Sequence, residues 1–379
     1  MKSKNLAHLE EKYKMKILYY TSKDPYSDKR GGAQLSTLAL KKEFNKKLFK
    51  SGLVSNFSEK RNIKADYKLA LPKSKITRKL ILDYFNPVVE KEMYSILEDF
   101  KPDLIHFNSI FGFPLNTINN IAKIYPVIIT VRDTWILEYS KIFPKFINNI
   151  HKNIALKKFK SILLIAPSKF IYEKLKNAGY KKVKLIYNSV DISPKKTSYK
   201  KTILYCGTIS SKKGLQTIIG ILDKIKNYRT LILGEGSLKK KLQEAYKNIE
   251  FLGYQDPKKY YQQGSILVMP SIWEEPFGRS TLEAMSYGLC VIGSNTGGTP
   301  ELIKPYETGL LFEPGNADDF EKKINYLLEN PETIKLMGNK ASNFIKKEYN
   351  YKEMIRNYKE AYQETINLFK KVKKQNTNR

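Results

Sequence analysis

The segment Trp273–Gly298, WEEPFGRSTLEAMSYGLCVIGSNTGG, indicates how the second half of the chain folds. An apolar run at 266–270 precedes it and predicts a buried strand. A helix is predicted from Ser280 to Tyr287, after the Pro-Phe-Gly turn, and a second strand is predicted at 289–292. This strand–loop–helix–strand order is typical of a parallel α/β sheet.

Two glutamates frame the predicted helix. Glu275 lies in the loop before the helix, and Glu283 lies on the helix itself. The amino end of a helix suits a phosphate group because it offers N–H groups and a partial positive charge. Carboxylates on either side of that phosphate accept hydrogen bonds from hydroxyl groups. The arrangement therefore favours a ligand in which a diphosphate joins a sugar to a nucleoside.

Three consecutive motifs carry a family resemblance. The E-x7-E pair, the pattern G-x-x-V-I-x-S-x-x-G-G-x-P-E at Gly288–Glu301 and the segment Gly309–Phe312 resemble the C-terminal half of retaining GT-B glycosyltransferases of the GT4 family, glycosyl transferases group 1. An E-x7-E spacing alone is compatible with a purely structural crossover, but the Gly-Gly-Thr-Pro-Glu that follows favours the family. The resemblance implies an α/β, GT-B fold, with two Rossmann-like, doubly wound parallel-sheet domains facing a cleft.

Size and composition fit that fold. The chain of 379 residues is long enough for two α/β domains, and no apolar stretch approaches the length of a membrane-spanning helix. The first 16 residues are charged and polar without the apolar core of a signal peptide, so we expect a cytoplasmic protein. Cys206 and Cys290 fall in predicted buried strands and are expected to be core thiols rather than a disulfide.

The positive charge is concentrated in the first half. Residues 1–190 contain 37 Lys and Arg against 16 Asp and Glu, a net +21, which leaves +10 of the total +31 for the remainder. Either the whole chain is biased toward lysine, or the first half attracts a polyanion such as anionic lipid, a lipid-linked pyrophosphate or nucleic acid. We expect no nucleic-acid partner, because the sequence has no nucleic-acid-binding motif beside its positive charge.

The first half has glycines and a histidine at predicted strand ends. Gly31 and Gly32 separate a strand at 15–20 from a helix that is expected to end near Phe49. They resemble the G-G-[AV]-[EQ] loop that faces the cleft in the family. His106 closes a strand at 103–107 and is expected to point to the carboxyl edge, where α/β sheets bind ligands. A structural role for this histidine is equally compatible with the sequence.

Two further positions in this half match family motifs with changes. Arg132 and Asp133 follow a strand at 127–131, where the family commonly has His-Asp. An arginine cannot act as a base but can bind a phosphate, so Arg132 is expected to contact a phosphorylated acceptor, with Asp133 orienting it. Asn188 begins a segment that matches the family's N-G-V-D, with Ser189 in place of glycine, and is expected near the acceptor.

The stretch Lys141–Lys160 contains six lysines, no acidic residue and interleaved apolar residues. It predicts a basic amphipathic helix. Such a helix either lies on an anionic membrane surface or packs its apolar face on the core with a solvated lysine face. The sequence leaves these two alternatives open.

We expect three parts in the chain: an acceptor-binding domain at 1–193, a nucleotide-sugar-binding domain at 194–350 and a helix at 351–379 that crosses back to the first domain. The second domain restarts the strand–helix alternation, with strands at 202–206, 229–233, 265–269, 289–292 and 309–312.

The resemblance implies a donor site in the second half. Glu283 would bind the ribose hydroxyls, and Glu275 would bind the hydroxyls of the sugar. Lys213, with the N–H groups of Phe277, Gly278 and Arg279, would stabilise the leaving diphosphate. Four further residues match donor-site motifs of the family and are expected to bind the donor: Gly207, Thr208, Gly234 and Gly236. Thr208 stands where the family usually has an arginine.

The resemblance implies transfer of a glycosyl group from a UDP- or GDP-sugar to an acceptor hydroxyl, with retention of configuration. No second carboxylate is placed as a covalent nucleophile, so we expect departure and attack on one face of the sugar. The sequence has no Asp-x-Asp and no metal-ligand cluster, so no metal and no cofactor are expected. The favoured acceptor is a lipid-linked or cell-surface glycan, as in polysaccharide biosynthesis at the inner membrane face. The alternatives are a soluble small acceptor and, third, a non-enzymatic polyanion-binding protein.

Overall fold

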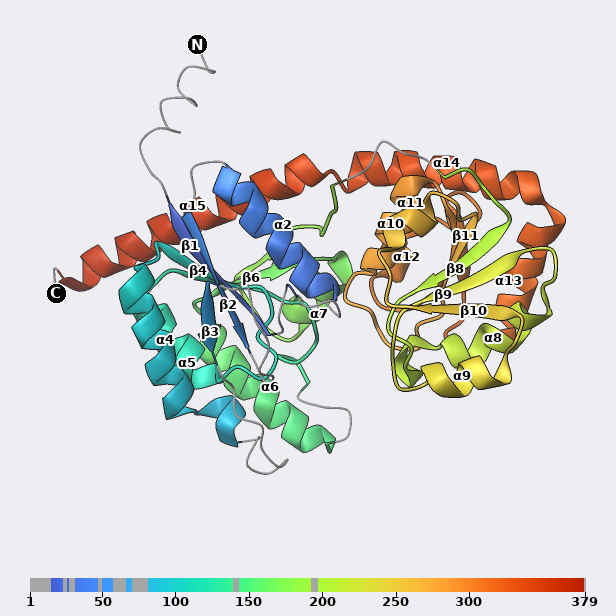
Figure 1. Cartoon of the computed structure of the whole chain (residues 1–379). Helices are drawn as coiled ribbons and strands as arrows, with labels where there is room; N and C mark the ends of the chain where they lie inside the picture. The colour runs from blue at the N-terminus through green and yellow to red at the C-terminus, as the bar shows by residue number, and fades with distance from the viewer. Residues whose placement is uncertain are drawn as a thin grey trace, which may run out of the picture. The chain divides into compact units, whose positions relative to one another are not determined.

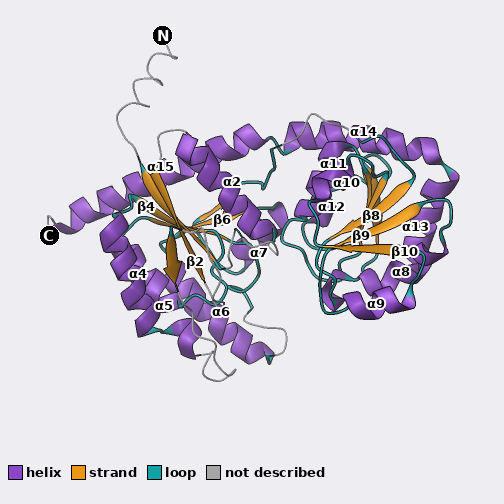
Figure 2. Cartoon of the chain, viewed as in Figure 1, coloured by secondary structure: helices purple, strands orange, loops and turns teal. Residues whose placement is uncertain are grey.

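The computed structural model describes residues 15–22, 26, 31–46, 50–56, 66–69, 81–138, 143–191 and 197–377. The chain divides into two compact units. Unit 1 comprises Met1–Pro167, Ile171–Ile186 and Ile355–Arg379, and unit 2 comprises Ser168–Phe170 and Tyr187–Met354. Each unit has a parallel sheet with helices packed around it (Figure 2), which confirms the expected fold class of two parallel-sheet α/β domains.

Unit 1 is built on a parallel sheet whose described strands lie in the order β3-β2-β1-β4-β5-β6-β7. The strands are β1 (Lys16–Thr21), β2 (Lys50–Asn56), β3 (Tyr67–Leu69), β4 (Leu104–Phe107), β5 (Val127–Thr130), β6 (Leu163–Ala166) and β7 (Val183–Leu185). The helices are α2 (Gly32–Lys46), α4 (Pro87–Phe100), α5 (Leu115–Ile124), α6 (Lys145–Phe159), α7 (Lys169–Asn177) and α15 (Tyr351–Thr377), whose residues from Ile355 onward belong to this unit (Figure 1).

Unit 2 has a parallel sheet in the order β10-β9-β8-β11-β12-β13 among its described residues. Its strands are β8 (Thr202–Cys206), β9 (Arg229–Leu233), β10 (Ile249–Gly253), β11 (Ile266–Met269), β12 (Cys290–Ser294) and β13 (Gly309–Phe312). Its helices are the 3₁₀ turn η1 (Ser211–Lys213), α8 (Leu215–Lys224), α9 (Lys239–Ala245), α10 (Pro257–Tyr261), α11 (Arg279–Tyr287), α12 (Thr299–Leu302), α13 (Ala317–Glu329) and α14 (Pro331–Glu348).

The core of unit 2 lies on both faces of its sheet. Ile203 and Val268 belong to one buried apolar cluster, whereas their strand neighbours Leu204 and Leu267 belong to the other. Parallel strands covered by helices on both faces need apolar residues at every position, which is why these strands read as unbroken apolar runs. Cys290 is buried in this core, and both cysteines are free thiols as expected.

Several elements differ from those expected. The strands β2, β3 and β10 were not expected from the sequence. The sequence pattern from about 75 to 100 is helix-like, but the helix is interrupted within its described part: residues 81–84 are helical, and a new helix, α4, begins after Asn86. The interruption follows from Pro87, which is favoured at a first helical position, and from the Asn86 side chain, which accepts a hydrogen bond from the Val89 N–H at 3.2 Å.

The unit boundaries fall at 186–187 and 354–355, compared with the domain boundaries expected at 193–194 and 350–351. Residues 192–201, with a proline and several lysines, are the linker that the sequence predicts, and 192–196 of this segment lie outside the described residues.

Candidate functional site

Each sheet has one place where the strand order reverses. In unit 2 the chain runs from β8 outward to β9 and β10 and then returns to β11 on the other side of β8. The loops that leave two such neighbouring strands diverge and form a crevice at the carboxyl edge of the sheet, where α/β proteins bind ligands. Here the two loops are 207–214, after β8, and 270–278, after β11. The candidate donor site is therefore placed by the topology of unit 2.

Backbone hydrogen bonds hold these two loops together. Ile272 N–H and Trp273 N–H both donate to the carbonyl oxygen of Lys212, at 3.0 Å and 3.1 Å. Gly214 makes this approach possible: its φ is +69°, and an added Cβ would lie 1.8 Å from the carbonyl oxygen of Pro270. The Lys212 ammonium also lies over the Trp273 ring, 5.0 Å from its centre.

Lys213 and Glu275 form an ion pair across the two loops. The Ser271 hydroxyl donates to the same Glu275 carboxylate oxygen, Oε1, at 2.9 Å. Both members of the pair are mostly buried, with 28% of the Lys213 side chain and 12% of the Glu275 side chain exposed. The structure thus brings together the lysine and the carboxylate that the sequence placed at the donor. Ser271, which was not expected there, follows β11 closely, and its position just beyond a strand end is the feature that could have identified it.

The loop that carries Glu275 is supported from behind by the Gly297–Gly298 pair. Gly298 N–H donates to the carbonyl oxygen of Glu275 at 2.7 Å. Gly297 has φ +61°, and a Cβ there would lie 2.4 Å from that same oxygen and 2.5 Å from the Glu275 nitrogen. The glycines in the motif are therefore required because the backbone of residues 274–275 passes directly against them.

Helix α11 begins beside this loop. Its N-cap is Gly278, with φ +84°, and a glycine has no side chain to occupy the space in front of the first turn. On the helix, Arg279 Nε donates to Glu283 Oε1 at 2.7 Å, and less than a fifth of either side chain is exposed. Phe277 has a buried side chain in the apolar core, so it can offer only its backbone to a ligand.

The loop after β9 packs against the loop after β8. Gly234 N–H donates to the Gly253 carbonyl oxygen at 2.7 Å, and a Cβ on Gly234 would lie 1.9 Å from the carbonyl oxygen of Gly207. A Cβ on Gly236 would lie 2.1 Å from the carbonyl oxygen of Ile209. Thr208, between these contacts, has an exposed side chain. Gly234 thus packs against Gly207, and Gly236 packs against Ile209, at the carboxyl edge of the sheet.

Unit 1 has its reversal between β1 and β4, and Asn108 lies there, directly after β4. Its side-chain nitrogen donates to the Ala33 carbonyl oxygen at 3.1 Å and to Thr37 Oγ1 at 2.6 Å, both on α2. Its side-chain oxygen accepts from Arg132 at 3.2 Å and 3.1 Å. Asn108 was missed by the sequence analysis. It links Arg132 to the start of α2, which begins at the predicted residue Gly32, directly after Gly31.

Asp133 closes the turn after β5, and its expected role in orienting Arg132 stays a prediction. Its Oδ1 accepts a hydrogen bond from Trp135 N–H at 2.9 Å. Burial raises the pKa of this carboxyl, while the hydrogen bond from Trp135 acts in the opposite direction. Asn108 is a residue that does hold the Arg132 guanidinium.

His106 does not face the carboxyl edge, and this expectation is corrected. The side chain is completely buried under α15, where Nδ1 bonds the Tyr362 hydroxyl at 2.8 Å and Nε2 bonds Thr130 Oγ1 at 2.7 Å. Burial, with the nearby charge of Arg132, lowers the pKa of His106 to about 3, so the ring is neutral at physiological pH. Asn188 is also buried, with 5% exposure, in unit 2.

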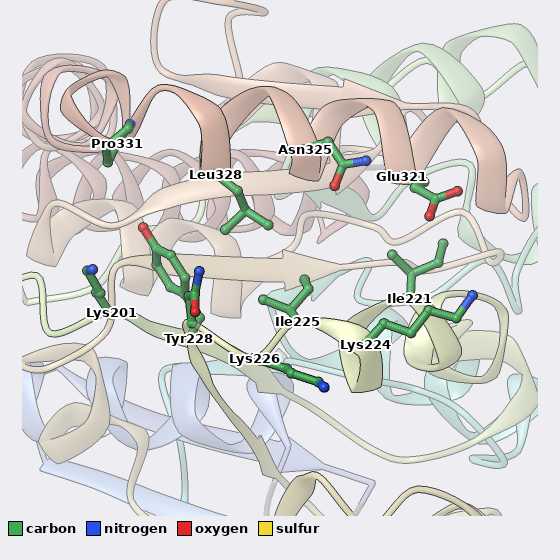
Figure 3. A pocket seen from close by; sticks show the side chains of 11 residues that line it. Lys201, Ile221, Lys224, Ile225, Lys226, Tyr228, Glu321, Asn325, Leu328 and Pro331 are labelled. Carbon is green, nitrogen blue, oxygen red and sulfur yellow. The ribbon is translucent and has the colours of Figure 1, made fainter.

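A cavity of about 380 Å³ lies at the opposite, amino edge of the unit 2 sheet (Figure 3). It is lined by residues just before β8 and β9 and by α8 and α13, among them Lys201, Tyr228, Ile225 and Leu328. None of the predicted donor residues lines it, so it is distinct from the crevice at the carboxyl edge.

No group of three or more His, Cys, Asp and Glu side chains in the described part of the chain is arranged to hold a metal ion. Within the same residues, no helix is long and apolar enough to cross a membrane.

Comparisons with known proteins agree with this geometry. The sequence model of the family "Glycosyl transferases group 1" matches residues 190–350, and that of "Glycosyltransferase Family 4" matches residues 30–194. A Klebsiella pneumoniae protein described as an uncharacterized 42.6 kDa protein in the cps region is 30% identical over 286 residues, 67% of this chain and 76% of that protein. This chain belongs to the group 1 glycosyltransferases. Its fold is GT-B, and it is a glycosyltransferase.

Two other proteins are similar to this glycosyltransferase. The sulfoquinovosyl transferase SQD2 of Arabidopsis thaliana is 31% identical over 185 residues, 46% of this chain and 36% of SQD2. The crystal structure of Anabaena Alr3699/HepE in complex with UDP and glucose superposes with a TM-score of 0.73 at 20% identity, covering 92% of this chain and 99% of that one. The same Anabaena protein has also been solved with UDP-glucose.

Proposed function

We propose that this glycosyltransferase transfers a sugar, with retention of configuration, from a UDP- or GDP-sugar to a hydroxyl group of a lipid-linked or cell-surface glycan. The observation that carries the donor half of the proposal is the Lys213–Glu275 ion pair at the reversal of the unit 2 sheet, beside the amino end of α11. A cation, a carboxylate and a helix amino end together suit a diphosphate that is attached to a hydroxyl-rich sugar.

Each group has a separate role in the proposed reaction. The bond between the anomeric carbon and the diphosphate oxygen breaks, and its electron pair goes to the diphosphate. Lys213 and the N–H groups at the start of α11 stabilise that growing charge, because fixed donors need no reorganisation as the bond breaks. The acceptor oxygen bonds the anomeric carbon on the same face and gives its proton to the leaving phosphate. Glu275 holds the sugar hydroxyls, and Glu283 holds the ribose hydroxyls.

The positive charge of Lys213 and of the helix end supports a reaction without a metal ion. The donor is proposed to be a UDP- or GDP-sugar, and the Anabaena structures with UDP and UDP-glucose support a uridine donor. The acceptor half rests on Arg132, whose guanidinium is held by Asn108 at the reversal of the unit 1 sheet. A guanidinium at that edge suits a phosphate on the acceptor, which favours a lipid diphosphate-linked saccharide at the inner membrane face.

The experiment is a thermal-shift and hydrolysis screen with UDP-, GDP- and ADP-sugars, with a chelator present in one series. A donor that raises the unfolding temperature and is slowly hydrolysed supports the proposal, and the anomer of the released sugar reports retention. Glu283→Ala is expected to abolish the thermal shift. A thermal shift that survives in Glu283→Ala would contradict the assigned role of Glu283. Turnover that stops when the chelator is present would contradict the metal-free reaction.

A further inference from the structure

Unit 1 exposes large apolar side chains on neighbouring elements. Those of Ile81, Phe85, Phe111, Phe146 and Ile150 are each between 48% and 67% exposed. Single exposed apolar residues are ordinary, but a group of them together marks a surface that binds another molecule or a membrane. We call these five residues, together with the lysines of α6, the apolar–lysine face.

A continuous series of ring contacts links the elements that carry these residues. The Phe111 ring lies 6.2 Å from that of Trp135, Trp135 lies 5.0 Å from His151, and His151 lies 5.7 Å from Tyr84. His151 also bonds the Tyr84 hydroxyl through Nδ1 at 2.8 Å. Ile150 adjoins His151 in α6, and Phe85 adjoins Tyr84. Phe111 therefore belongs to this packed aromatic group, and Phe85 and Ile150 each adjoin one of its members in the sequence.

The burial of α6 addresses the two alternatives left open by its sequence. His151, Ala155 and Phe159, spaced four apart, are the residues that face the core. Phe146 and Ile150, also four apart, point outward on another face and take no part in that packing. Core packing alone thus accounts for only one of the two apolar stripes of the helix, and the outer stripe remains to be covered.

Lysines accompany the outer stripe. The helix carries Lys145, Lys152, Lys157 and Lys158, Lys160 follows it, and residues 141–160 contain no acidic side chain. Partial burial, with the charges of Lys123 and Lys157, lowers the pKa of Lys158, as expected where positive charges crowd without counter-ions. An apolar stripe with flanking lysines complements an anionic bilayer, since the rings enter the headgroup region and the ammonium groups meet the phosphates.

We propose that the apolar–lysine face docks this glycosyltransferase on the surface of an anionic lipid bilayer. Phe111 and Trp135 lie in the loops after β4 and β5, at the same carboxyl edge of the unit 1 sheet as Arg132. Docking there places the bilayer next to the proposed acceptor-binding group. In this respect the inference rests on the proposed function, because a lipid-linked acceptor would be presented from that bilayer.

The test is flotation of the full-length protein with vesicles of phosphatidylcholine alone and of phosphatidylcholine with 30–40% (about one third) phosphatidylglycerol. We expect binding to the anionic vesicles only. The double variant Phe146→Ser/Ile150→Ser is expected to lower the partition coefficient at least about tenfold. The matched control is Leu336→Ser in α14 of unit 2, which removes an apolar side chain that is 56% exposed and is expected to leave binding unchanged.

A second pair of variants tests the charge. Lys157→Gln/Lys160→Gln is expected to weaken binding several-fold, and Lys240→Gln/Lys241→Gln, on exposed positions of α9, to have little effect. Equal binding by Phe146→Ser/Ile150→Ser and Leu336→Ser would overturn the proposal. The proposal would also be overturned if the protein bound polyphosphate or RNA as strongly as it binds vesicles, and if both kinds of binding were lost in 0.5 M (about three times physiological) salt. That result would indicate general attraction to polyanions.

The donor assay separates this inference from the proposed function. Phe146→Ser/Ile150→Ser is expected to keep the thermal shift with the donor while losing vesicle binding. Glu283→Ala is expected to show the reverse. Loss of both properties in Phe146→Ser/Ile150→Ser would mean that this variant is misfolded. In that case Phe146→Tyr, which keeps the aromatic ring, decides the matter: the proposal requires it to float with the vesicles as the parent does.

Discussion

Substitution of Gly297 by alanine tests whether the glycine pair shapes the donor site. The left-handed φ of +61° at Gly297 costs an alanine about 1–2 kcal/mol. The added Cβ would also lie 2.4 Å, 2.5 Å and 2.8 Å from backbone atoms of Glu275 and Glu274. Because these are backbone atoms, the loop must shift, at a cost of about 1–3 kcal/mol. The shift also strains the 2.7 Å hydrogen bond from Gly298 N–H to Glu275, which contributes about 1 kcal/mol.

Gly297→Ala is therefore expected to lower the free energy of unfolding by about 3–6 kcal/mol, the sum of these three contributions. Gly315→Ala is the matched control, because Gly315 has φ +80° but no atom within 4 Å of an added Cβ, so it carries the backbone cost alone. Scanning calorimetry is expected to show that Gly297→Ala melts several degrees below Gly315→Ala. Isothermal titration with the donor nucleotide is expected to show weaker binding, by about tenfold, only for Gly297→Ala, because Gly297 packs against the loop that carries Glu275 and Gly315 does not. Equal melting temperatures and equal affinities for the two variants would refute the argument.

Three further outcomes are expected. Lys213→Met should weaken donor binding about 10- to 100-fold, because it removes a charged hydrogen-bond donor to the diphosphate and leaves Glu275 without its ion-pair partner. Lys212→Met should change donor binding little. Equal losses of affinity for the two variants, measured by titration calorimetry, would contradict this. Arg132→Ala should raise the KM for a diphosphate-linked acceptor without changing donor hydrolysis, and an unchanged KM would remove Arg132 from the acceptor site. His106 has its pKa lowered to about 3 in the folded state, so its contribution to stability is complete above pH 6.5 and is lost as the pH falls from 6.5 toward 3. The free energy of unfolding of the parent should therefore be lower at pH 5 than at pH 7, by at most about 1.4 kcal/mol per pH unit. Chemical denaturation should show a smaller decrease for His106→Gln. Equal decreases in the two proteins would contradict the interpretation that His106 is neutral in the folded state.

Much of the donor half could be predicted from the sequence because its determinants are local. Glycines at strand ends, apolar runs and the E-x7-E pair each act within one strand–loop–helix unit, and their order indicates a parallel sheet. Glu275, Lys213 and the glycines after β8 and β9 accordingly lie at the carboxyl edge, as expected. The second alternation of strands and helices, which begins at Thr202, similarly predicts a second sheet.

The acceptor half depended on contacts between distant segments. His106 follows the same local rule as the other strand-end residues, yet Tyr362, 256 positions away, covers it. In a strand that is buried on both faces, all positions are apolar or neutral, so periodicity cannot show which face a helix from elsewhere will cover. The C-terminal helix decides this for β4, and in doing so it makes His106 part of the core.

The sequence by itself thus determined the family, the two parallel sheets and the donor motifs, since these depend on neighbouring residues and on the order of elements. Only the tertiary structure decided that Asn108 holds Arg132, that Ser271 joins the Lys213–Glu275 pair, and that Phe146 and Ile150 face outward. These outcomes depend on which strands become neighbours and which helix covers each face. Packing between segments far apart in the chain settles both, and no local pattern encodes it.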